Sequence, residues 1–199
     1  MQFKELCRKI WYFLWESDSI WSWLANIALA FVLIKFIVYP GLGLLLGTSY
    51  PVVAVVSGSM EHDGSLEDWW TSTASCNGQS CTQEAWYAAH GITQEQFQGF
   101  SFKNGFNKGD IMVLKGVKPK NIKTGDVLVF MSSEKADPII HRVMVIQGDE
   151  TTGYVFQTKG DHNADSGSID ADIQEQEVLG KAVFRIPFLG WVKILAVTV

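Results

Sequence analysis

The chain has 199 residues, enough for one soluble domain and an anchor but too few for two full domains. Acidic residues outnumber basic ones by 21 to 16, and the formal net charge at pH 7 is -5. Because no cluster of Lys and Arg is available to release counterions from phosphates, this balance argues against nucleic acid as a partner and disfavours anionic lipid over a broad face.

The N-terminal part of the chain predicts a membrane anchor. Residues 20–39, IWSWLANIALAFVLIKFIVY, contain one charged side chain and, at about 1.5 Å per helical residue, span a hydrocarbon layer of about 30 Å. We expect Pro40, Gly41 and Gly43 to end this helix and the anchor to extend over residues 20–46. Nearby aromatic residues are typical of a belt at the membrane interface, with core packing as the alternative: Trp11, Tyr12, Trp15, Trp21 and Trp23.

The charges around this anchor predict its orientation. Lys4, Arg8 and Lys9 precede it, whereas no Lys or Arg occurs between residues 36 and 102. Residues 1–19 are therefore expected to form a cytoplasmic arm, with the protein in the cell membrane, in contact with lipid, and its main domain extracytoplasmic. The apolar run exceeds the roughly 7 to 15 residues of a secretory signal, and no small-x-small cleavage pattern follows immediately, so retention is favoured.

The cysteines agree with this topology. Cys76 and Cys81 lie in a loop on the predicted outer side, where an oxidising environment would let them form a small disulfide. The alternative is that both remain free. Cys7 lies on the predicted inner side, where thiols stay reduced.

The region beyond the anchor predicts a mainly β fold. Short segments rich in Val, Ile and Phe are bounded by turn residues at 51–56, 109–116, 125–132, 139–146, 154–161 and 181–186. We expect residues 47–60 and 108–191 to form a compact antiparallel domain. Residues 61–107 form an acidic, aromatic insertion of irregular structure, with one short helix near residues 82–90. For the apolar residues 187–199, three alternatives stay open: the start of a second membrane helix, an interfacial segment or a final strand.

Two serines after the first predicted strand, Ser57 and Ser59, raise the question of nucleophilic chemistry. A serine hydroxyl needs a neighbouring base to remove its proton and a group to hold that base. His141 lies within a predicted strand, on the same face as Ile139 and Val143. A buried imidazole there needs a partner on each nitrogen, and a hydroxyl and a carboxylate would serve. An ordinary core histidine is the alternative.

Candidate carboxylates occur in the stretch TKGDHNAD. Asp161 and Asp165 lie in one tight turn, where their side chains can orient a histidine or accept local N–H groups. Neither an H-E-x-x-H motif nor paired C-x-x-C motifs occur, so we expect no metal and no cofactor. Any activity should therefore be insensitive to chelators.

Taken in order, these motifs resemble those of the type I signal peptidases. SGSM after an anchor, GD before a hydrophobic strand, IIHRV and TKGDHN occur in the family order over residues 51–59 and 109–191. Bacterial members have a lysine where archaeal and endoplasmic-reticulum members have a histidine. Because this chain has His141 at that position, it is similar to the Ser-His type, with an archaeal member favoured.

The resemblance implies a role for each motif residue. Ser59 would attack the scissile carbonyl, and His141 would take its proton and pass it to the leaving amine. The Ser57 hydroxyl and the Ser59 N–H would form the oxyanion hole. Asp161 matches one acid of the family and Asp165 resembles the second, although the family spacing between the two acids is longer. Asp170 is therefore another candidate for the second acid.

The resemblance also implies a substrate. It predicts an endopeptidase that removes signal peptides from secretory precursors at the outer membrane face, after small residues at the third and first positions before the cut. One alternative is a processing protease with few clients, selected by the insertion. Another is an inactive anchored β domain that acts as a binding scaffold. The sequence does not identify partner subunits.

Overall fold

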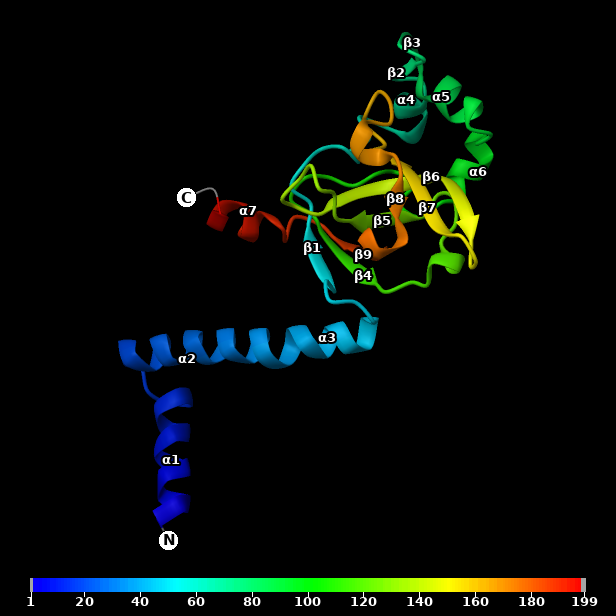
Figure 1. Ribbon diagram of the computed structural model, residues 1–199. Coiled ribbons are helices and arrows are strands. Elements are labelled where there is room, and N and C mark those ends of the chain that lie inside the picture. Colours follow the sequence, from blue (N-terminus) through cyan, green and yellow to red (C-terminus); the bar gives the residue numbers. More distant parts are fainter. Residues whose placement is uncertain (1, 198–199) are drawn as a thin grey trace. The chain divides into compact units, whose positions relative to one another are not determined.

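The computed structural model describes residues 2–197 and divides the chain into two compact units, Met1–Leu45 and Leu46–Val199. The first unit begins with α1 (Gln2–Trp15) and α2 (Ile20–Leu33), which a short turn joins (Figure 1). The Ser19 hydroxyl caps α2 by accepting a hydrogen bond from the Ser22 N–H. The Asn26 amide donates to the Leu14 carbonyl at 2.7 Å and so ties the end of α1 to α2.

The helical stretch of the predicted anchor is longer than expected. After α2 it continues through a π-helical turn, η1 (Ile34–Val38), into α3 (Tyr39–Leu46). The prediction that Pro40 and the following glycines end the helix is wrong. A helical proline clashes with the carbonyl four residues before it, and the wider π turn directly ahead of Pro40 relieves that crowding. The stretch Ile20–Leu46, 27 residues in all, is long and apolar enough to cross a membrane.

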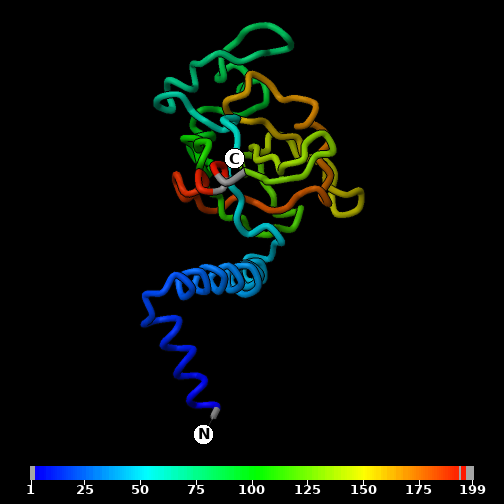
Figure 2. Tube along the Cα trace, turned by 90° about the vertical axis from the view of Figure 1, so that its left-hand side faces the viewer, coloured from blue at the N-terminus to red at the C-terminus, as the bar shows by residue number. Residues whose placement is uncertain are grey.

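The second unit is built on a curled antiparallel sheet, which confirms the predicted mainly β fold (Figures 1 and 2). Seven strands follow the order β1-β4-β9-β5-β6-β7-β8, so β1 lies at one edge. Their bounds are Val52–Ala54 for β1, Ile111–Lys115 for β4, Val127–Phe130 for β5, Ile139–Asp149 for β6, Gly153–Lys159 for β7, Ile173–Gln174 for β8 and Val178–Ile186 for β9. Short 3-10 turns connect some of them: η2 (Pro119–Asn121), η3 (Ser168–Asp170) and η4 (Glu175–Glu177).

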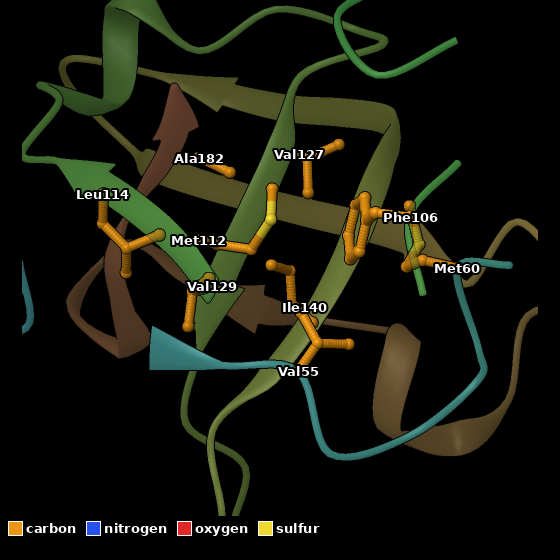
Figure 3. Packing of buried hydrophobic residues seen from close by; sticks show 9 residues of the cluster. All are labelled: Val55, Met60, Phe106, Met112, Leu114, Val127, Val129, Ile140 and Ala182. Atoms are coloured by element: carbon orange, nitrogen blue, oxygen red, sulfur yellow. The ribbon is translucent and has the colours of Figure 1, made fainter. Parts of the chain in front are cut away.

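The central strand β5 shows how the core is built. All its residues are buried, and they alternate between the two faces of the sheet. Val127 and Val129 enter one cluster, shown in Figure 3, whereas Leu128 and Phe130 enter the cluster on the other face. Strand β6 alternates in the same way. Ile140 belongs to the first cluster, whereas Ile139 and Val143, which share a face with His141, belong to the second. The predicted orientation of His141 is therefore confirmed.

The insertion at residues 61–107 is folded and not irregular. It contains α4 (Leu66–Trp70), a hairpin of β2 (Thr73–Cys76) and β3 (Gln79–Thr82), α5 (Gln83–Ala89) and α6 (Gln94–Gln98). Helix α5 is the short helix predicted near residues 82–90. The insertion has an aromatic core of its own, formed mainly by Trp69, Trp70, Trp86, Tyr87 and Phe97. Its elements are too short to produce a visible hydrophobic period, which is why the sequence pattern missed them.

The structure also bears on the predicted disulfide and on the apolar C-terminal segment. Cys76 and Cys81 form a disulfide that closes the β2-β3 hairpin, with their Cα atoms 5.8 Å apart, whereas Cys7 is free. Near the C-terminus a helix, α7 (Trp191–Val197), occupies most of the apolar segment. A final strand is therefore excluded for residues 191–197, while residues 198 and 199 lie outside the described part of the chain.

Candidate active site

Ser59 and His141 form the centre of the candidate site. Ser59 lies in the turn after β1, and its Oγ is 3.0 Å from Nε2 of His141 on β6. His141 is only 3% exposed, whereas Ser59 is half-buried. Because β6 is paired on both sides, with β5 and β7, the backbone of the histidine is held rigidly. The structure thus brings a solvent-accessible hydroxyl to a buried, fixed base.

Asp170 occupies the other side of the imidazole. Its Oδ1 lies 2.5 Å from Nδ1 of His141 and accepts a second hydrogen bond, at 2.6 Å, from the Thr158 hydroxyl. The Gly167 N–H donates to Oδ2 at 3.2 Å. Burial alone would raise the pKa of Asp170. The hydrogen bond from His141, the electrostatic attraction of that ring and the hydrogen bonds from Thr158 and Gly167 outweigh burial, so the pKa of Asp170 is lowered.

The charge of Asp170 determines the tautomer of His141. An ionised carboxylate can only accept, so Nδ1 of the imidazole carries the proton and donates it. In the neutral imidazole Nε2 is then an acceptor, and the Ser59 hydroxyl must donate to it. This is the protonation state in which a histidine can act as a general base toward a serine.

A second hydroxyl and a cleft lie beside the nucleophile. The Ser57 and Ser59 Oγ atoms are 3.3 Å apart. Since the Ser59 proton is directed to His141, Ser57 is the donor in this pair. The cleft has a volume of about 340 Å³, and both serines and the histidine line it together with apolar side chains such as Val56, Ile139 and Ile140. An extended peptide with small side chains fits a space of this size and character.

Comparison with known proteins finds relatives over about half of the chain. No family model matches the chain. Over 104 residues it is 35% identical to the signal peptidase complex catalytic subunit SEC11 of Lachancea thermotolerans. The matched segment covers 47% of this chain and 60% of that protein. Over 100 residues it is 29% identical to the signal peptidase complex catalytic subunit SEC11C of Homo sapiens, with coverage of 48% and 52%. The chain is similar to signal peptidase catalytic subunits. It spans about half the length of the curated relatives it matches, and the resemblance inferred from the motifs is confirmed.

The two acids expected from the signal peptidase motifs have partners other than His141. Asp161 is completely buried and forms an ion pair with Arg142 through Nε at 2.9 Å and Nη2 at 2.6 Å. It also accepts hydrogen bonds from His62 Nε2 at 3.0 Å and from the Tyr87 hydroxyl at 3.2 Å. Asp165 accepts a hydrogen bond from the Trp86 indole at 2.8 Å. Among the described residues, Asp170 is the acid that the structure brings to His141.

The electrostatics of Asp161 suit a structural ion pair. Burial disfavours its charged form, but the Arg142 guanidinium and the hydrogen bonds from His62 and Arg142 outweigh burial and hold the pKa of Asp161 well below its usual range. Burial would likewise lower the pKa of Arg142, and the charge of Asp161 raises it instead. Both groups are therefore charged at neutral pH, and the pair fixes the start of the loop that leads to Asp170.

Gly160 is required by the closeness of this loop to the two reacting side chains. A Cβ atom at residue 160 would lie 2.7 Å from the Ser59 carbonyl oxygen and 2.8 Å from His141 Nε2. The His162 N–H donates to the same Ser59 carbonyl at 2.9 Å, and the Asp161 N–H donates to the sulfur of the buried Met60 at 3.4 Å. The loop thus packs directly on the turn that carries the nucleophile.

Sequence reasoning missed several residues of this site. Thr158 stands within the quoted TKGDHN motif, yet nothing in the motif assigns its hydroxyl to an acid twelve residues further on. His62 falls in the stretch for which the sequence predicts irregular structure, but its ring is buried and stacks on that of Trp69, with the ring centroids 3.8 Å apart. These residues are recognised only when the insertion and the loop are seen in contact.

Proposed function

We propose that this chain is a membrane-anchored serine endopeptidase that removes signal peptides from secretory precursors. The observation that carries this proposal is the 3.0 Å contact between Ser59 Oγ and His141 Nε2, at the edge of a cleft, in a chain similar to signal peptidase complex catalytic subunits. Acyl transfer from a peptide requires a nucleophilic hydroxyl, a histidine in the correct tautomer to remove its proton, and a carboxylate to hold the histidine. In this structure hydrogen bonds link these three groups.

In the proposed mechanism, His141 Nε2 removes the Ser59 proton as Oγ attacks the scissile carbonyl. Asp170 holds the imidazole and stabilises the positive charge that then develops on it. The Ser57 hydroxyl and the Ser59 N–H donate to the oxyanion of the tetrahedral intermediate. His141 gives its proton to the leaving amine, and in the second half of the reaction it activates the water that hydrolyses the acyl-enzyme.

The substrate segment is proposed to bind as an extended strand. Strand β1 lies at the edge of the sheet next to the nucleophile, and such an edge can pair with an added peptide. The apolar cleft favours small side chains near the scissile bond, as expected for signal peptides with small residues at the third and first positions before the cut.

The location follows from the same proposal. The apolar helix Ile20–Leu46 would anchor the enzyme in the membrane in which the signal peptide itself lies, and this raises the effective concentration of substrate. The Cys76-Cys81 disulfide supports an oxidising, extracytoplasmic compartment for the domain. Since the relatives are named as subunits of a complex, partner proteins are expected to copurify with the chain.

The test uses the full chain, purified in detergent and returned to lipid vesicles, with a fluorogenic signal-peptide substrate. The wild-type protein is expected to cleave it after the small residue, and both Ser59→Ala and His141→Ala are expected to abolish cleavage. Ser80→Ala, which removes an exposed hydroxyl on β3, is the matched control and should retain full activity. His141→Lys tests whether lysine can replace the base.

Two outcomes separate the alternatives. Cleavage that persists in Ser59→Ala would exclude this nucleophile, and a wild-type protein that cleaves no precursor would favour an inactive scaffold. A survey of secreted N-termini after depletion of the protein distinguishes a general enzyme, whose loss leaves many precursors uncleaved, from a protease with few clients.

A further inference from the structure

The loop that carries Asp170 poses a positioning problem. Residues 160–170, here called the acid loop, connect β7 to the residues before β8, and their only regular structure is the short turn η3. Surface loops of this kind are normally mobile. Asp170 must nevertheless stay within hydrogen-bond reach of His141, because a displacement of about 1 Å can cost a factor on the order of 100 in rate.

The insertion contacts the acid loop along its first half. The Trp69 indole donates to the Asp161 carbonyl at 3.1 Å, and the Gln83 amide donates to the Asn163 carbonyl at 3.2 Å. The Ser75 N–H donates to the Ala164 carbonyl at 2.9 Å. With the bond from Trp86 to the Asp165 carboxylate, the insertion therefore satisfies successive acceptors of the loop. Figures 1 and 2 show the green insertion beside this orange part of the chain.

Two buried cations connect the insertion to the sheet. The Lys159 ammonium donates to Gln83 Oε1 at 2.9 Å and lies 4.9 Å above the Trp86 ring and 5.3 Å from that of Tyr87. The guanidinium of Arg142 lies 4.8 Å from the Phe97 ring. Both cations come from the paired strands β6 and β7, and the aromatic rings come from the insertion. Cation-π contacts that are shielded from water in this way are stronger than exposed ones.

The insertion does not take part in the cleft beside Ser59 in the way that it takes part in the acid loop. The described residues that line it come from β1, the turn with the serines, the segment 135–141 and the acid loop, and none comes from residues 61–107. The insertion therefore packs against the acid loop and contributes no residue to the lining of the cleft. This placement argues against the view that it selects clients through the cleft.

We propose that the insertion is a positioning element, which holds the acid loop so that Asp170 stays on His141. The catalytic part of this inference rests on the proposed function. Trp86 is the residue that tests it best, because its indole N–H bonds to the loop while its ring belongs to the aromatic core. Trp70 is a matched control, since it lies in the same core and its indole N–H is buried without a hydrogen-bond partner.

The experiment compares Trp86→Phe with Trp70→Phe in the full chain. Hydrogen exchange of the amides of residues 160–170 is expected to become several-fold faster in Trp86→Phe and to remain at the wild-type rate in Trp70→Phe. The kcat for signal-peptide cleavage is expected to fall roughly 10- to 100-fold in Trp86→Phe, and by a larger factor than KM changes, because Asp170 acts on His141 and not on the substrate. Trp70→Phe should retain the wild-type kcat.

A double-mutant comparison shows whether the effect acts through Asp170. In an Asp170→Ala background, Trp86→Phe should cause no further loss of kcat. An equal loss in both backgrounds, or equal exchange rates in Trp86→Phe and Trp70→Phe, would overturn the proposal. If Trp86→Phe does not fold, Asp165→Ala removes the same hydrogen bond by changing its exposed acceptor. We expect the same faster exchange and the same loss of kcat in that variant. A wild-type protein without peptidase activity would defeat the proposed function alone, because the exchange rates still decide whether the insertion holds the loop.

Discussion

His141 and Asp170 meet through a 2.5 Å hydrogen bond between Nδ1 and Oδ1 although 29 residues separate them in the chain. The histidine comes from a strand in the interior of the sheet, and the aspartate comes from a short turn at the end of the acid loop. Because the carboxylate is buried and also accepts a hydrogen bond from Thr158, its position is defined by more than one partner. This contact orients the imidazole toward Ser59.

Replacing Asp170 by asparagine should reduce kcat by roughly 1,000- to 10,000-fold, since the amide can leave the histidine in the wrong tautomer. Steady-state cleavage of a signal-peptide substrate measures the effect. Asp165→Asn serves as the control because its amide oxygen can still accept the Trp86 hydrogen bond, and kcat should stay close to wild type. A large loss in the control together with a small loss in Asp170→Asn would show that the acids have been assigned incorrectly.

Replacing Gly160 by alanine should lower kcat by roughly 100-fold, because the new methyl group would displace the Ser59 carbonyl or the His141 ring. Kinetics with the same substrate, and circular dichroism to check folding, measure this. Gly167→Ala adds a methyl group to the same loop at an ordinary contact distance of 3.9 Å from Asp170 and should be nearly silent. Equal activities of the two variants would contradict the steric argument.

Removing the charge of Arg142 should destabilise the domain strongly. Arg142→Met leaves the buried Asp161 carboxylate without its cation, and we expect a loss of roughly 3–5 kcal/mol in the free energy of unfolding, measured with denaturant. Since the pKa of Asp161 is lowered in the folded state, its contribution is present above the unfolded value near 3.9 and disappears as the pH falls further. The wild-type protein should therefore lose stability steeply below about pH 4, and Asp161→Asn should do so less. An Arg142→Met variant of wild-type stability would argue that the ion pair contributes nothing.

Lys159 should make the stability of the domain rise at alkaline pH. Burial lowers the pKa of Lys159 from 10.5 to about 8 in the folded state. Between these values the unfolded chain binds more protons than the folded one, so the free energy of unfolding increases with pH, by a total on the order of 3 kcal/mol. Lys159→Met should lack this increase, whereas Lys120→Met, which changes a half-exposed lysine, should keep it. Parallel pH profiles for Lys159→Met and the wild-type protein would refute the prediction.

The sequence by itself determined the features that depend on local pattern. Hydropathy along residues 20–39 indicated a helix that can cross a membrane, apolar segments bounded by turn residues indicated the strands, and alternation around residue 141 indicated the face on which His141 lies. The order of the motifs indicated the family resemblance. Each of these signals is contained in a few consecutive residues, or in their order, and needs no knowledge of distances in space.

The tertiary structure alone decided which groups meet. Three aspartates near residue 160 look alike in sequence, but only the path of the acid loop brings Asp170 to His141 and leaves Asp161 on Arg142. The short helices and strands of the insertion pack around an aromatic core, and the hydrophobic pattern of residues 61–107 does not predict that core. A hydrogen bond between residues 141 and 170 depends on how the sheet, the loop and the insertion pack together, and that packing is a property of the whole domain, not of any segment.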